Sequence, residues 1–234
     1  EYQEKLRDLG VDVDTSQVVT SALGVAFVLA QNYPQGTKVF MIGEDGIRKA
    51  LEGKGFEVLP VECAPEAQVV VQGIDRGVNF QKVAEAALLV RNGIPFYTTN
   101  TDKTFPTPRG EIPGSGAWLS VVITATGVEP ISAGKPFPYL MELSLERLGT
   151  RKEETLVVGD RLETDIAAGQ SSCIRMAGRG GRLRRSCGGL SAGSSALCGV
   201  TMRRLGWPVC RTARRDHSTL QSRRQPRLSR LYVR

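Results

Sequence analysis

The forty residues from 131 to 170, ISAGKPFPYLMELSLERLGTRKEETLVVGDRLETDIAAGQ, constrain the fold more than any other part of the chain. An apolar strand ends at Ala133, a helix covers 138–148, and Gly149 stands where a helix C-cap glycine belongs. Residues 155–158 are apolar without alternation, which is typical of a strand buried on both faces of a parallel sheet. Another helix follows. Strand, helix, strand and helix in this order predict an α/β fold with a parallel sheet.

Three side chains suited to phosphate chemistry follow the two strands of this unit. Lys135 comes after the first strand, and Asp160 and Asp165 come after the second. In an open α/β sheet such residues meet at the carboxyl edge, where ligands bind. Two carboxylates supply the oxygen ligands that Mg²⁺ prefers, and a lysine offsets phosphate charge. The alternative is structural, because an aspartate in the first turn of a helix, here behind a Thr164 N-cap, can simply be a cap or dipole partner.

GKPFPYLMELSLERLG and VVGDRLETDIAAG resemble the third and fourth motifs of the haloacid dehalogenase superfamily, in the class with a large inserted cap. That class includes 4-nitrophenylphosphatases, phosphoglycolate phosphatases and pyridoxal phosphatase, and the resemblance runs from Glu1 to Gln170. It implies that Lys135 holds the nucleophile and the substrate phosphate, and that Asp160, supported by Asp165, ligates Mg²⁺. The family's nucleophile, an aspartate of a DxDGT-like motif on the first strand, and its TNN-type phosphate-binding motif are not found in this chain.

The resemblance divides the chain into four parts. Residues 1–21 resemble the core helix and strand that follow the TNN motif, 22–130 the inserted α/β cap of the C2 type, and 131–170 the core with its GKP and GDRxxTD motifs. Residues 171–234 match nothing in the family. Because the chain opens on Glu1 rather than methionine, we expect a fragment. Its Rossmann-like parallel-sheet core should be incomplete and lack the first two strands, which carry the nucleophile.

The loop that contains Asn100 and Asp102 is the candidate substrate contact in the cap. Its sequence matches a TNxDxxxP element of the class, which by resemblance belongs to cap and substrate contacts. The alternative is a polar turn in which Asn and Asp cap their own backbone. The two interpretations are evenly balanced for Asn100, and the functional one is favoured for Asp102.

The segment 171–234 differs abruptly in composition from the rest. It holds 15 of the chain's 31 basic residues, all arginine, and one of its 24 acidic residues, which leaves 16 basic and 23 acidic residues, net −7, for 1–170. A disordered arginine-rich arm can bind RNA, but this segment has no RGG or RS repeats. A lysine-free mixture of Arg, Gly, Ser, Cys and Pro favours a frameshifted, disordered terminus. Its four cysteines contain no CxxC pair, which argues against a zinc site.

These observations predict a Mg²⁺-dependent phosphomonoester hydrolase lineage that works through an aspartyl-phosphate and acts on a small phosphorylated metabolite. The chain itself is expected to be inactive, because the nucleophile motif is not found. The alternative is a catalytically inactive fragment or a non-enzymatic protein with a basic, nucleic-acid-binding tail. We expect no membrane partner, and nucleic acid is not the favoured partner. We expect a cytoplasmic location, since one cysteine in 170 residues fits a reducing compartment. A homo-oligomer formed through the cap is compatible with the pattern.

Overall fold

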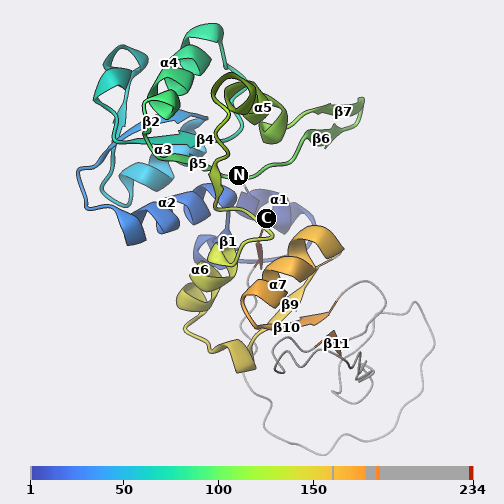
Figure 1. Cartoon of the computed structure of the whole chain (residues 1–234). Coiled ribbons are helices and arrows are strands. Elements are labelled where there is room, and N and C mark those ends of the chain that lie inside the picture. The colour runs from blue at the N-terminus through green and yellow to red at the C-terminus, as the bar shows by residue number, and fades with distance from the viewer. Residues whose placement is uncertain (1, 160, 178–182, 185–231, 234) are drawn as a thin grey trace, which may run out of the picture.

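The computed structural model describes residues 2–159, 161–177, 183–184 and 232–233. Figure 1 shows two α/β bodies. The larger contains a five-stranded sheet, the smaller a three-stranded one, and helix α2 (Ser21–Asn32) lies between them and packs on both. The predicted α/β class is confirmed. No helix in this described part is long and apolar enough to cross a membrane.

The larger body is built on a parallel sheet with the strand order β3-β2-β4-β5-β8. The strands are β2 (Lys38–Ile42), β3 (Glu57–Leu59), β4 (Val69–Gln72), β5 (Phe96–Thr98) and β8 (Ile131–Ser132). The two central strands, β2 and β4, are almost wholly buried and carry apolar residues without alternation. That pattern is expected when both faces of a parallel sheet are covered.

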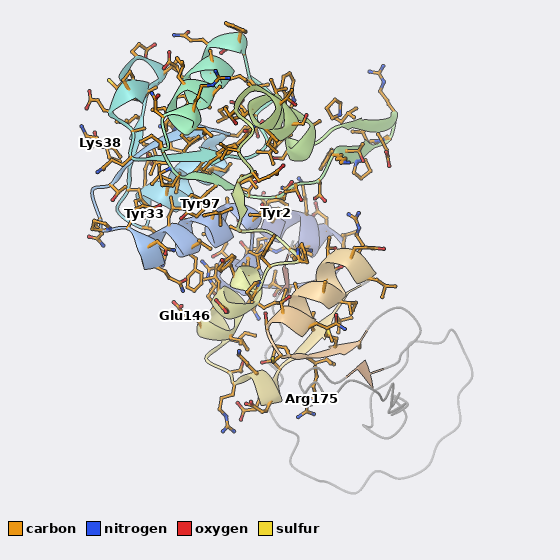
Figure 2. The ribbon with its side chains drawn as sticks, viewed as in Figure 1. Tyr2, Tyr33, Lys38, Tyr97, Glu146 and Arg175 are labelled. Carbon is orange, nitrogen blue, oxygen red and sulfur yellow. The ribbon has the colours of Figure 1, made fainter. Side chains whose placement is uncertain are left out.

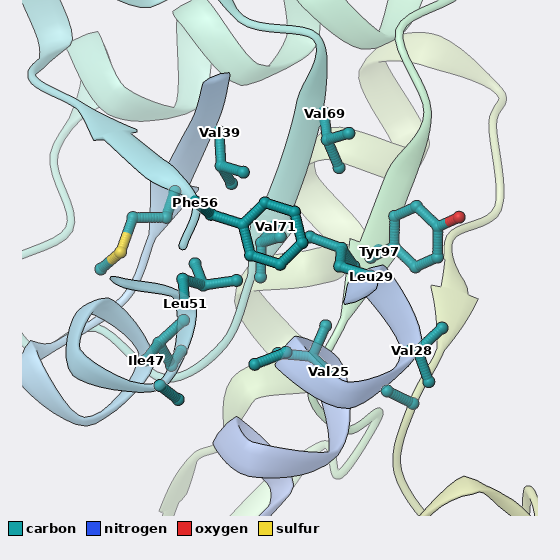
Figure 3. Close-up of a cluster of buried hydrophobic side chains, with 14 residues drawn as sticks. Val25, Val28, Leu29, Val39, Ile47, Leu51, Phe56, Val69, Val71 and Tyr97 are labelled. Carbon is teal, nitrogen blue, oxygen red and sulfur yellow. The ribbon is translucent and has the colours of Figure 1, made fainter. Parts of the chain in front are cut away.

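Alternate residues of each strand face two separate clusters of helices. On one face, α2 and α3 (Asp45–Glu52) pack against Val39, Val69 and Val71, as the close-up in Figure 3 shows. On the other face, α4 (Phe80–Arg91) and α5 (Ser115–Thr126) pack against the side of the sheet that carries Phe40 and Val70. Helix capping fixes where two of these helices begin. The Thr20 hydroxyl accepts the Leu23 N–H, and the Asn79 amide oxygen accepts the Lys82 N–H.

The smaller body carries the second half of the motif region. Its sheet has the order β11-β10-β9, in which β9 and β10 are parallel and β10 and β11 antiparallel. Its elements are α6 (Tyr139–Leu148), β9 (Leu156–Val158), a π-helical turn (Leu162–Ile166), α7 (Ala167–Ser171), β10 (Arg175–Ala177) and β11 (Leu183–Arg184). Met141 of α6 packs with Ala168 and Ile174 beneath the sheet. Helix α6 ends at Gly149 in the left-handed conformation, as its sequence predicts.

Short elements at the beginning and end of the chain complete the description. They are α1 (Tyr2–Asp8), a 3-10 turn (Thr15–Gln17), β1 (Val18–Val19) and β12 (Tyr232–Val233). Strand β1 pairs in parallel with β12. The arginine-rich segment was predicted to be disordered and of frameshifted origin. These predictions concern mostly residues 178–182 and 185–231, which lie outside the described residues.

Two predicted boundaries can be compared with the strand pairing. Residues 131–133 were expected to open the core, and β8 forms the edge of the five-stranded sheet, which the sequence assigns to the cap and which is called the cap sheet below. It pairs with β5, and the Ala133 N–H donates to the Thr98 carbonyl at 2.9 Å. The core was also expected to stop at Gln170, yet the chain continues through the end of α7 into β10, which pairs with β9. Both differences have one cause, because a two- or three-residue strand is placed by its hydrogen-bond partners, which local sequence does not reveal.

Three local predictions also differ from the structure. The loop after Asn100 contains an antiparallel hairpin of β6 (Thr104–Thr107) and β7 (Gly110–Pro113), both mostly exposed. Strand β9 is not buried on both faces, since Val158 is 73% exposed. The segment around Asp165 begins as a π-helical turn after Arg161, so Thr164 lies inside that turn and does not cap a helix.

Candidate functional site

Lys135 and Asp165 meet between the two bodies. Lys135 follows β8 at the edge of the cap sheet, and Asp165 lies in the π-helical turn after β9. The Lys135 Nζ donates to the Asp165 Oδ1 at 2.7 Å, and both side chains are largely shielded from solvent. The two motifs that the sequence separates by a helix and a strand are therefore brought into direct contact.

The backbone around Asp165 is shaped to receive its carboxylate. The second carboxylate oxygen, Oδ2, accepts the Arg161 N–H at 3.2 Å. Gly159 leaves room for the side chain, because a Cβ at that position would lie 2.2 Å from the Asp165 Cβ. Within the turn, the Asp165 N–H donates back to the Arg161 carbonyl at 3.0 Å. The Asp165 side chain is thus held on both sides, by a cation of the cap sheet edge and by the backbone of its own loop.

The residues at this junction meet only part of what a metal site requires. Carboxylate oxygens are the donors that a hard cation requires, but Asp165 already accepts from Lys135 and from the Arg161 backbone. In the described part of the chain no group of three His, Cys, Asp or Glu side chains is placed to hold a metal. Asp160, the expected principal ligand, lies outside the described residues. The geometry of Asp165 therefore suits a supporting role beside a metal, and the metal site itself stays a prediction.

The cap loop with Asn100 and Asp102 lies beside the same site. The Asn100 Oδ1 accepts the Asp102 N–H at 3.2 Å, which is the local turn that one sequence interpretation predicts. The Asp102 carbonyl accepts the Gly116 N–H at 2.8 Å. The Asp102 carboxylate oxygen Oδ1 lies 4.0 Å from Nη1 of Arg161. Asn100 therefore shapes the loop, while Asp102 faces the loop that follows β9.

Gly134 brings the cap loop close to Lys135. A Cβ at Gly134 would lie 2.5 Å from the Thr99 carbonyl oxygen and 3.3 Å from the Asn100 Cα. The structure therefore places four of the five candidate residues, Asn100, Asp102, Lys135 and Asp165, at one junction. Sequence reasoning gave Arg161 no role. Its position directly after Asp160 and four residues before Asp165 was the one sequence feature that could have marked it as part of the site.

One pair of aspartates has the spacing of a nucleophile motif without its setting. Asp12 and Asp14 flank the buried Val13 between α1 and the 3-10 turn at 15–17, and both are exposed. Asp12 lies 3.8 Å from the Arg7 side chain, and the Asp14 N–H donates to the Gln17 side chain. Neither follows a buried strand, so the segment does not match the family's nucleophile position.

The fold and the junction define an α/β protein with a parallel five-stranded sheet and with paired basic and acidic residues after its strands. The family model for haloacid dehalogenase-like hydrolases matches residues 3–172. The chain belongs to this family, which confirms the resemblance drawn from its motifs.

Several known proteins are similar to the chain over the same region. The acid sugar phosphatases of Staphylococcus epidermidis and Staphylococcus aureus are 42% and 43% identical to it over 166 residues. The match covers 71% of this chain and 62% of each relative, so the chain spans less than two thirds of their length.

Solved structures of phosphatases are also similar to the chain. A glycerol phosphate phosphatase from Mycobacterium tuberculosis, crystallised with magnesium, superimposes with a TM-score of 0.71 at 35% identity, covering 76% of this chain and 53% of that one. A thermostable NPPase from Geobacillus stearothermophilus superimposes with a TM-score of 0.69 at 38% identity, covering 75% and 69%.

Proposed function

We propose that the chain derives from a Mg²⁺-dependent phosphomonoester hydrolase that acts on a small phosphorylated metabolite. The single observation that carries this proposal is the Lys135–Asp165 contact at the strand ends, directly beside the cap loop. A lysine supported by a carboxylate is suited to binding a phosphate group, and the same sequence motif contains a second aspartate, Asp160. The names of similar proteins, an acid sugar phosphatase, a glycerol phosphate phosphatase and a p-nitrophenyl phosphatase, support a phosphomonoester as the substrate class.

The residues of the chain have separate roles in this proposal. Lys135 binds a non-bridging phosphate oxygen and offsets its charge, and Asp165 orients the lysine. A metal held by Asp160 with Asp165 would supply further charge neutralisation on the transferring phosphoryl group. Asn100 and Asp102 contact the rest of the substrate from the cap side and help to exclude water.

The reaction of the family proceeds through an aspartate that attacks phosphorus, releases the alcohol and is regenerated by water. The sequence contains no DxDGT-like motif. We therefore propose that this chain, by itself, binds phosphate groups without turning them over. We also propose a cytoplasmic location, and self-association through the cap, where Trp118 and Val121 are exposed on α5. The rival function, nucleic-acid binding by the basic tail, rests on residues outside the described ranges.

The experiment is an assay of 4-nitrophenyl phosphate hydrolysis by the purified chain with Mg²⁺, together with calorimetric titration of Mg²⁺. We expect no turnover, and weak Mg²⁺ binding that Asp160→Ala removes. Turnover abolished by Lys135→Ala would show that the chain supplies a nucleophile and that the inactivity proposal is wrong. Turnover, or Mg²⁺ binding, that is unchanged in both Lys135→Ala and Asp160→Ala would contradict the assigned site.

A further inference from the structure

Arg161 stands between two carboxylates that belong to different bodies of the protein. Its backbone N–H donates to the Asp165 Oδ2 at 3.2 Å, which holds it to the smaller body. Its guanidinium Nη1 lies 4.0 Å from the Asp102 Oδ1, which belongs to the cap loop. The backbone of Arg161 therefore contacts Asp165, the acid that orients Lys135. The side chain of Arg161 contacts the candidate substrate loop.

A second contact, within the larger body, ties the cap loop to the residue before Lys135 and limits how the loop can move. Gly134, the neighbour of Lys135, is packed so closely against Thr99 and Asn100 that a Cβ would not fit between them. The Asp102 carbonyl is in turn fixed to the first turn of α5 through the Gly116 N–H. A displacement of residues 99–102 must therefore change the contact at Gly134, the contact at Arg161, or both.

The two contacts of Arg161 differ in strength. The pair with Asp102 is long and exposed, with 64% and 55% of the two side chains accessible, and exposed pairs of this kind are weak and screened by salt. The hydrogen bond to Asp165 is shorter, and its acceptor is mostly buried. The side-chain contact can therefore break and re-form while the backbone contact persists, which suits a cap that has to open and close.

We propose that Arg161 is a positioning residue that couples the cap loop to the Lys135–Asp165 pair, with Asp102 as its partner. It holds the loop over the phosphate-binding groups without itself contacting phosphate. The use of this coupling in a reaction rests on the proposed function. The coupling itself does not, so it is measured without substrate.

The test is amide hydrogen exchange, followed by NMR, in the 234-residue chain and its charge-reversal variants. We expect Asp102→Arg to speed exchange of the Arg161 amide, and Arg161→Asp to speed exchange of the Gly116 amide, each about two- to fivefold. The effects should be reciprocal, because coupling between two sites is. The swapped double variant should restore both rates, and about 1 M salt should remove the differences.

The matched control is Arg151→Asp, which breaks an ion pair with Glu154 in the smaller body and should leave the Gly116 amide unchanged. Effects confined to the body that carries each substitution, or a double variant no better than the single ones, would overturn the proposal. So would differences that persist in high salt. A chain that shows this coupling but binds no phosphate would retain the inference on Arg161 and lose only the proposed function.

Discussion

Lys135 and Asp165 connect the edge strand of the five-stranded sheet to the turn after β9, with their Nζ and Oδ1 atoms 2.7 Å apart. The strands that precede the two residues, β8 and β9, belong to different sheets. The pair therefore contributes to the association of the two bodies as well as to the proposed phosphate site. Its removal should affect stability even in the absence of any ligand.

The stability of this pair can be measured with a double-mutant cycle. Lys135→Met and Asp165→Asn should each lower the free energy of unfolding by about 1–3 kcal/mol, because each leaves a partly buried group without its charged partner. The double variant should lose less than the sum of the two. Urea denaturation of the four proteins gives the coupling. Additive losses would show that the contact contributes nothing to stability.

Gly134 should tolerate no side chain. Gly134→Ala places a Cβ 2.5 Å from a backbone oxygen, which cannot move as a flexible side chain can, so we expect a loss of about 1–3 kcal/mol in thermal or urea unfolding. Gly46→Ala is the matched control, since nothing lies within 4 Å of its Cβ in helix α3. It should stabilise the protein by about 0.5–1 kcal/mol. Equal effects at the two positions would argue against close packing of the cap loop.

The raised pKa of Tyr97 predicts that the protein loses stability in alkaline solution. Burial, and then its hydrogen bond with Tyr33 at 3.3 Å, raise the pKa of the Tyr97 hydroxyl above its ordinary value of 10.0. The two rings meet edge to face, and Figure 2 shows them side by side. A raised folded-state pKa means that its contribution is fully present below pH 10 and is lost as the pH rises further.

The measurement is urea unfolding between pH 9 and about 11.5. Tyr97→Phe should flatten the alkaline decline in the free energy of unfolding, whereas Tyr2→Phe, at a half-exposed tyrosine on α1, should not. An alkaline slope that is the same in wild type and Tyr97→Phe would assign the decline to other groups.

Hydrogen exchange should separate the two sheets. Strand β4 is fully buried and bonded to β2 and β5 on its two sides, whereas in the described part of the chain β9 pairs with β10 alone. The amides of Val69–Val71 should therefore be protected more strongly than those of Leu156–Val158. Equal protection would mean that the smaller sheet is as stable as the cap sheet.

The sequence predicted the long elements well. Helix α6 and its glycine cap follow from the apolar periodicity and from the preference for glycine after a helix. Lys135 and Asp165 meet although the strands before them belong to different sheets, which the sequence did not predict. Sequence failed where a strand is too short or too untypical in composition to reveal its partner, and where a partner is distant in the chain. Ile131 and Ser132 are too few to specify which sheet they join, and the cross-strand pairing of Phe105 with Ile112 was hidden in a loop rich in Thr, Pro and Gly. Arg161 was missed because its partner, Asp102, lies 59 positions earlier in the chain.

The most direct test of the central claim is ³¹P NMR titration of inorganic phosphate into the chain with Mg²⁺. We expect Mg²⁺-dependent binding, weak because the family's nucleophile motif is not found, and lost in Lys135→Ala. The control Lys38→Ala removes a partly exposed lysine of β2 that pairs with Glu66, away from the proposed site, and it should bind as the wild type does. Equal binding by wild type and Lys135→Ala, or equal losses in the two lysine variants, would contradict the assignment of Lys135 as the phosphate-binding residue.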